Sequence, residues 1–236
     1  MMPPLRRAIA AAILVPLALA LAACLFLPGK FQSTLTIHAD RSFAYSYTGE
    51  VVAIDLTGAM TKAVSGMADA AEDGSATPSD EATDAAEDPA KKDAEYRELA
   101  EQVRKEAGYK TVEYRGNGVF YVDYALSGRL THNFLFPYNQ DAGMVFPFLA
   151  VELRGKDGVR IKAPGFAKSE GKGAMGTGDD AIAKLDGSFT LITDAEIVSQ
   201  NNEDGATTVP GGKSITWKVN SQTDDAPMAV LRVAGL

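Results

Sequence analysis

The sequence predicts an α+β fold, in which two main helices pack on a largely antiparallel β-sheet. Aromatic and small polar residues alternate along residues 43–54, and this period of two is typical of a half-buried strand. Two strand-like runs, 109–115 and 119–126, are joined by Gly-Asn-Gly, which supplies the positive φ angles of a tight hairpin turn. Apolar residues recur at helical spacing in two segments, 57–71 and 89–107.

Strand-like runs cover most of the chain after residue 30. The first of them, 31–37, is expected to form a hairpin with the alternating strand that follows it. Further strands are expected at 131–138, 144–153, 159–163, 188–197, 213–219 and 228–233. Pro137 and Pro147 remove ladder donors, so those runs bend or lie at a sheet edge there. The polar segment 201–212 is expected to be a loop, and Trp217 to be a core anchor.

The two helical segments differ in how well their ends are marked. Asp88 is a suitable N-cap for the second helix, Pro89 fits its first position, and Gly108 ends it. Gly58 and Gly66 weaken the first helix.

Acidic residues are concentrated in one part of the chain. The formal net charge is −8, and the interval from Asp69 to Glu95 alone carries the same excess of acids over lysines. Residues 72–88 contain no large apolar side chain, so we expect a disordered insertion there. A negative chain is a poor match for phosphate backbones, and we expect no nucleic-acid partner.

The N-terminus has the features of an export signal. Arg6 and Arg7 precede an apolar run that extends from Ala8 to Ala23, which predicts a signal peptide over residues 1–23. The arginines favour the cytoplasmic side, so the rest of the chain is expected to cross the membrane. Cys24 is the single cysteine of the chain, and a chain without further thiols suits an oxidising compartment.

Leu21-Ala22-Ala23-Cys24 resembles the lipobox of bacterial lipoproteins. The resemblance implies diacylglyceryl transfer to the Cys24 thiol, cleavage before Cys24, and a further acyl chain, expected to be palmitate, on the new amine. Two alternatives stay open. The apolar run continues to Pro28, long enough for an uncleaved membrane span, or an ordinary signal peptidase cuts after Ala22 or Ala23 and leaves a soluble protein.

These features predict that the chain has three parts. Residues 1–23 are the signal peptide, residues 24–30 are the lipid anchor and tether, and residues 31–236 form a single α+β domain interrupted by the acidic insertion at 72–88. The expected location is the bacterial envelope, with the protein held on the periplasmic or outer face of a membrane through its N-terminal lipid.

The sequence contains no recognisable catalytic or metal-binding constellation. His38 and His132 are the two histidines, and no spacing groups them with carboxylates or a thiol into a metal site. The nucleophile elbow Gly-x-Ser-x-Gly is absent, and the glycines at 171 and 173 do not have P-loop spacing. We expect no enzyme activity, no cofactor and no metal, although a glycosidase pair of carboxylates needs no local motif and stays open.

An apolar ligand site is suggested by aromatic residues in two neighbouring strand-like runs. The residues concerned are Phe134, Phe136, Tyr138, Phe146 and Phe148. Because alternate residues of a strand face opposite sides, one set can fill the core while the other meets solvent, a ligand or the bilayer. The two interpretations are a sheet covered on both faces and a lipid-binding groove.

Strand sequences at both ends of the exported part resemble those of LppM-type bacterial lipoproteins. They are Thr34-Leu35-Thr36-Ile37 with Ser42-Phe43-Ala44-Tyr45-Ser46-Tyr47, and Ser188-Phe189-Thr190-Leu191 with Glu196-Ile197 and Lys213-Ser214-Ile215-Thr216-Trp217. The resemblance implies an α+β envelope domain with helices on an antiparallel sheet, and binding of lipid or glycolipid.

Two functional hypotheses follow. The first is an exported, membrane-anchored, non-enzymatic lipoprotein that binds lipid or another apolar ligand in the cell envelope. The second is a protein-interaction module of an envelope complex, which would use a sheet edge or the acidic segment to hold a protein partner.

Overall fold

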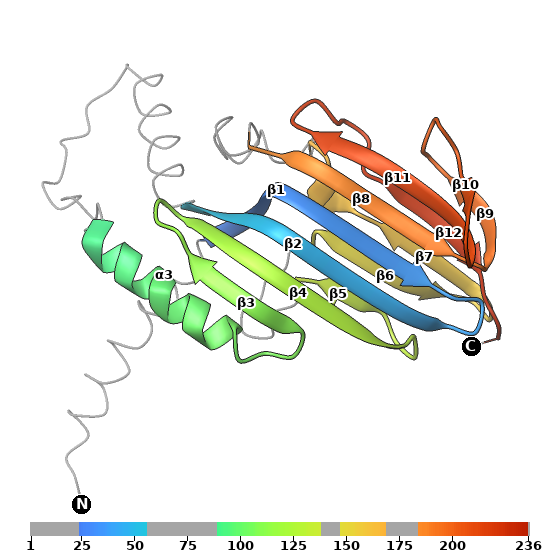
Figure 1. Cartoon of the computed structure of the whole chain (residues 1–236), viewed down its shortest axis with the longest axis horizontal. Coiled ribbons are helices and arrows are strands. Elements are labelled where there is room, and N and C mark those ends of the chain that lie inside the picture. Colours follow the sequence, from blue (N-terminus) through green and yellow to red (C-terminus); the bar gives the residue numbers. More distant parts are fainter. Residues whose placement is uncertain (1–23, 56–88, 138–146, 169–183, 236) are drawn as a thin grey trace, which may run out of the picture.

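The computed structural model describes residues 24–55, 89–137, 147–168 and 184–235, and these form two stacked β-sheets with one helix beside them (Figure 1). The large sheet has the strand order β10-β11-β8-β1-β2-β4-β3. Its strands are β1 (Cys24–Ile37), β2 (Ser42–Asp55), β3 (Tyr109–Tyr114), β4 (Val119–Arg129), β8 (Asp186–Thr193), β10 (Thr207–Val209) and β11 (Gly212–Asn220).

The small sheet lies behind the large sheet in the view of Figure 1 and has the order β5-β6-β7-β12-β9. Its strands are β5 (Phe134–Phe136), β6 (Leu149–Arg154), β7 (Gly158–Lys162), β9 (Glu196–Gln200) and β12 (Met228–Arg232). Within the described residues, neighbouring strands are antiparallel except for β1 and β8, which run parallel. The two predicted hairpins, β1–β2 and β3–β4, are confirmed.

The hydrophobic core lies between the two sheets. Alternate residues of β1 and β8 point inward, so Leu35 and Leu191 are fully buried while their neighbours Thr34 and Thr190 face outward. The small sheet contributes buried side chains from the opposite side, including Val151, Val159, Ile161, Ala229 and Leu231. Burial of each large aliphatic side chain stabilises the fold by about 1.5–3 kcal/mol.

Aromatic rings connect the layers through Phe166, which belongs to the short 3₁₀ helix η1 (Pro164–Phe166). Its ring stacks on Phe31 of β1 with centroids 4.3 Å apart and also contacts Phe189 of β8. The Phe31 ring needs glycine on a neighbouring strand, because a Cβ at Gly187 would lie 2.4 Å from the Phe31 carbonyl oxygen and 2.6 Å from its ring. Phe189 in turn stacks on Trp217, which is buried as predicted.

Helix α3 (Pro89–Val103) packs against β3 and begins at the predicted proline (Figure 1). Its buried residues are Tyr96 and Ala100, one turn apart on the same face. The Tyr96 ring lies edge-on to Phe120 of β4, so the helix covers part of the large sheet beside the small sheet. The predicted helix over 89–107 is therefore confirmed, although it ends four residues early.

The predicted fold class is wrong. The described chain is mostly β-structure arranged as two sheets, with a single helix, and is not an α+β fold with two main helices on one sheet. The physical reason is that alternation shows that one face of each strand is buried but not what covers it; here a second sheet covers it. The other predicted helix, 57–71, and the acidic insertion, 72–88, lie outside the described residues.

The interpretation of 188–197 as one strand is also wrong. The chain leaves the large sheet at Thr193 and enters the small sheet at Glu196, so the run is divided between β8 and β9. At this corner the buried Thr193 hydroxyl donates to the Ile37 carbonyl at 2.6 Å and accepts from the Ala195 amide. The alternation of apolar residues continues across the corner, which hides it from pattern analysis. Part of the expected loop 201–212 is strand β10, which pairs with β11.

Candidate functional site

The predicted lipidation site is located at the start of the fold. Cys24 is the first residue of β1, and its backbone is in register with Asp55 at the end of β2. Residues 24–30, which we expected to tether the domain, are therefore part of the large sheet. The lipobox residues Leu21, Ala22 and Ala23 lie outside the described residues. Among the described residues, no helix has the length and apolarity needed to cross a bilayer.

The aromatic residues proposed as a ligand site mostly fill the core. Phe136 and Phe148 are 2% and 1% exposed, and both pack against the buried Tyr47 ring. Phe134 is half-buried and contacts the Phe43 and Tyr45 rings of β2. The other two members of the set, Tyr138 and Phe146, lie outside the described residues. Of the two interpretations, the positions of Phe136 and Phe148 favour the covered sheet.

Two buried tyrosines of the predicted alternating strand 43–54, Tyr45 and Tyr47, also occupy the core. The Tyr45 hydroxyl accepts a hydrogen bond from Ser33 at 3.1 Å, and the Tyr47 hydroxyl donates to the Glu50 carbonyl at 2.7 Å. Burial raises the pKa of both phenols well above the usual range, so both stay protonated and neutral. Their burial on alternate residues of β2 agrees with the aromatic face that the alternation predicts.

The two histidines make different contacts. His38 Nδ1 lies 3.1 Å from the Asp194 carboxylate, which also accepts a 2.6 Å hydrogen bond from the Ala39 amide. These contacts join the β1–β2 turn to the corner between β8 and β9. His132 contacts the neighbouring Thr131 hydroxyl. Among the described residues, no three His, Cys, Asp or Glu side chains gather in a way that could hold a metal ion.

The side of the small sheet that faces away from the core carries both apolar and basic side chains. We call this surface the small-sheet face, and it includes Leu135, Glu152, Arg160, Lys162, Val198, Met228 and Val230, with Glu152 of β6 opposite Arg160 of β7. Their orientation follows from burial, because the residues that alternate with them, such as Ile161 and Leu231, are fully buried. Val198 is 49% exposed, and the other members are partly exposed.

Register places the basic and apolar members of the small-sheet face side by side. Arg160 of β7 lies opposite Val230 of β12, and Lys162 lies opposite Met228. Among the described residues, neither cation is in an ion pair, whereas the neighbouring Arg154 and Arg232 both pair with carboxylates. The hydrogen bond from Arg154 lowers the pKa of Glu152, with further lowering by the charges of Arg160 and Lys162.

The opposite surface of the sandwich has a different chemistry. We call it the large-sheet face, and it consists of Gln32, Thr34, Thr36, Ser46, Thr48, Ser188, Thr190 and Thr216. Hydroxyl groups are in register across several strands, and the Thr190 and Thr216 hydroxyls are 3.0 Å apart. This face also carries charged groups. Lys30 and Asp186 border a pocket, Asp123 of β4 lies beside Thr48, and Lys218 of β11 lies beside Ser188.

Comparisons with known proteins find similarity to a solved structure. No family model matches the chain, and no curated protein matches it. The NMR structure of the folded domain of LppM from Mycobacterium tuberculosis matches over 89% of this chain and 94% of that chain, with 18% identity and a TM-score of 0.33. The strand sequences of this chain resemble the same lipoprotein group.

Proposed function

We propose that this protein is an exported, non-enzymatic lipoprotein of the cell envelope, anchored through lipid on Cys24, and that it binds lipid with the small-sheet face. The observation that carries this proposal is the register that sets the cations Arg160 and Lys162 beside the apolar Val230 and Met228. Such a mixture suits the bilayer interface, where apolar side chains enter the acyl boundary and cations meet anionic headgroups.

The position of Cys24 supports the anchor. The lipobox directly precedes β1, and the large sheet begins at the cysteine itself. A lipid on this residue would hold the sandwich next to the membrane surface without an intervening linker. Two or three acyl chains would make this attachment stable, whereas a single chain would bind only marginally.

The anchor also explains why a weak lipid-binding surface would suffice. Two cations near an anionic surface contribute about 1 kcal/mol each, which gives a free protein only weak binding that salt reduces. A covalent anchor makes the contact intramolecular and raises its effective concentration. The small-sheet face would then orient the domain and hold lipid headgroups that are already close to it.

The core supports a lipid contact on the outside of the sandwich. Phe136 and Phe148 pack against Tyr47 and against each other, so these rings are occupied in holding the two sheets together. An acyl chain that entered between the sheets would have to displace rings that are packed at the density of a protein interior. An acyl chain can contact the apolar atoms of the small-sheet face without displacing any core ring.

The anchor is tested by Cys24→Ser in the full-length protein. The native chain is expected in the membrane fraction with a mass that lacks residues 1–23 and includes the acyl chains. The serine variant is expected to keep its leader or to appear in the soluble fraction. A variant that stays membrane-bound at the leader-free mass of the native protein, without acyl chains on either, would contradict the lipoprotein assignment.

The lipid surface is tested by vesicle flotation of the leader-free chain carrying Cys24→Ser, so that no acyl chain contributes. Binding is expected to vesicles containing anionic phosphatidylglycerol and to fall with salt. The double variant Arg160→Glu/Lys162→Glu is expected to abolish this vesicle binding, because each substitution makes the small-sheet face more negative by two charges. The matched control is Lys218→Glu on the opposite surface, which is expected to bind as before. Equal binding by all three chains would refute the assignment of this face.

A further inference from the structure

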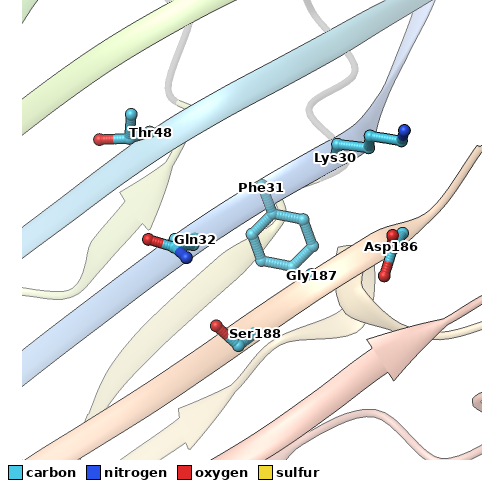
Figure 2. Close-up of a pocket in the computed structure, with 7 residues that line it drawn as sticks. All are labelled: Lys30, Phe31, Gln32, Thr48, Asp186, Gly187 and Ser188. Atoms are coloured by element: carbon cyan, nitrogen blue, oxygen red, sulfur yellow. The ribbon is translucent and has the colours of Figure 1, made fainter.

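A pocket of about 420 Å³ opens on the large-sheet face where β1, β2 and β8 meet. Figure 2 shows Gln32, Thr48 and Ser188 in a line across the three strands, with Lys30 and Asp186 together at one end. Phe31 and Gly187 complete the lining between these polar residues. Its volume is within the range of about 300–1,000 Å³ that small-molecule sites occupy.

The charged groups at the end of the pocket are available to a ligand. Lys30 and Asp186 are in register on the parallel strands β1 and β8, both on the outer side. Among the described residues, the Lys30 ammonium and the Asp186 carboxylate form no ion pair with each other or with another side chain. An ammonium offers three donors and a carboxylate only acceptors, so a ligand that meets both must donate and accept hydrogen bonds.

Several ligand classes do not match this lining. A phosphate or other anion would meet the Asp186 carboxylate as well as Lys30, and a metal ion would find one carboxylate beside an ammonium. An apolar ligand would bury the Gln32 amide and the Thr48 hydroxyl without partners, which is unfavourable. The matching class is a neutral molecule whose own groups both donate and accept.

We propose that this pocket binds a sugar unit of a neutral saccharide. Each sugar hydroxyl is a donor and an acceptor, and two adjacent hydroxyls can donate to the two oxygens of the Asp186 carboxylate. Lys30 donates to a third oxygen, and the Gln32 amide with the Ser188 hydroxyl satisfies the remaining polar groups. This site is on the opposite side of the sandwich from the proposed lipid surface, so the two could be used together.

The surface next to the pocket can hold further sugar units. Thr34 and Thr190 lie two residues along β1 and β8 from Gln32 and Ser188, on the same side and in register with each other. Thr216 continues this row on β11. The row is uncharged and rich in hydroxyls, which would accept a neutral chain. We therefore expect an oligosaccharide to bind more tightly than its monosaccharide.

The experiment is isothermal titration of the full chain, in a detergent without a sugar headgroup, with neutral oligosaccharides of glucose, galactose, mannose and arabinose. Saturable binding of at least one is expected, and Asp186→Ala should weaken it by about tenfold or more, since a hydrogen bond to a charged group is lost. Ser188→Tyr, which fills the pocket from a half-buried, outward-facing position, should abolish it. Lys156→Ala in the exposed turn between β6 and β7 is the control and should leave the affinity within about twofold.

Two outcomes would overturn the proposal. One is that no neutral oligosaccharide binds saturably to the native chain, or that binding survives both pocket variants while their unfolding midpoints match the native value. The other is that a uronic-acid oligosaccharide of the same length binds more tightly than the neutral one, since the Asp186 carboxylate should repel it. Both results can be obtained whether or not the lipid surface exists.

Discussion

The two outer faces of the sandwich differ in charge and hydrophobicity, although both belong to strands that pack on one core. On the large-sheet face the outward positions of β1 and β8 are mostly glutamine, serine and threonine, with Lys30 and Asp186 at one end and Ile192 near the other. On the small-sheet face those of β7 and β12 hold arginine, lysine, methionine and valine. The inward positions of both sheets are occupied by the same kinds of large apolar side chain. Packing constrains the inward residues alone, so the outward residues carry the information about function.

The core is common to both faces, so a change there should affect them equally and have the largest effect. Phe148→Ala is expected to destabilise the protein by about 3–5 kcal/mol, because it removes a buried ring between the sheets. Urea unfolding measures the loss, and Val198→Ala on the exposed surface is the control, expected within about 0.5 kcal/mol of the native protein. If Phe148→Ala unfolds like the control but alters lipid uptake, the ring lines a ligand groove and the comparison of faces fails.

A smaller effect should distinguish two glycines of the large sheet, Gly187 of β8 and Gly128 of β4. Gly187→Ala places a Cβ 2.4 Å from the Phe31 carbonyl oxygen, and overpacking of this kind costs about 1–3 kcal/mol. In Gly128→Ala the nearest atom is the Phe43 ring at 3.5 Å, an ordinary contact, so stability should change by less than about 1 kcal/mol. Thermal unfolding compares the two variants. Similar losses would show that the Phe31 ring does not depend on the neighbouring glycine.

Glu152→Gln tests whether the charge of the small-sheet face controls binding to anionic vesicles. Removing this carboxylate beside Arg160 and Lys162 should strengthen binding to anionic vesicles by about 1 kcal/mol, or roughly fivefold. The hydrogen bond from Arg154 lowers the pKa of Glu152, so the native carboxylate stays charged at neutral and mildly acidic pH. Binding by the native chain should therefore rise only once the pH falls below about 4.5, and the variant should lack this step. Unchanged vesicle binding by the variant at pH 7 would count against the face.

The smallest effect concerns the corner that joins the two sheets. The hydrogen bond from the Ala39 amide, with help from His38, lowers the pKa of Asp194 below its usual value. A lowered carboxyl pKa adds stability above about pH 4, and this is lost as the pH falls through the folded-state value. Asp194→Asn should therefore cost less than about 1 kcal/mol at pH 7, because the group is largely exposed, and the difference should vanish near pH 3. If Asp194→Asn lowers the free energy of unfolding by the same amount at both pH values, the loss comes from packing and not from the carboxylate charge.

Local features of the fold could be predicted from the sequence. The alternation along β2, the Gly-Asn-Gly turn between β3 and β4, and the proline at the start of α3 each depend on a few neighbouring residues. The arrangement of the sheets could not be predicted in this way. The corner at Asp194 and Ala195 carries the same alternation as the strands on either side, so nothing in the pattern shows that the chain changes sheet.

The candidate site illustrates the same limit. Clustered aromatics identified Phe136 and Phe148 as important, and they are, but as core residues in contact with Tyr47. The alternative surfaces are made of single residues from strands distant in sequence, such as Lys30 with Asp186 and Lys162 with Met228. Only the strand order brings these pairs together, and strand order depends on long-range packing.

The most direct test of the account is to determine which face meets the bilayer. The lipid-anchored protein is placed in a nanodisc that contains phosphatidylglycerol and a lipid with a spin-labelled headgroup, and the amide signals are compared with those from an unlabelled disc. The account predicts strong loss of signal at Arg160, Lys162 and Val230, and little at Thr34, Thr190 and Thr216. Equal loss of amide signal on both faces, or loss confined to the large-sheet face, would contradict it.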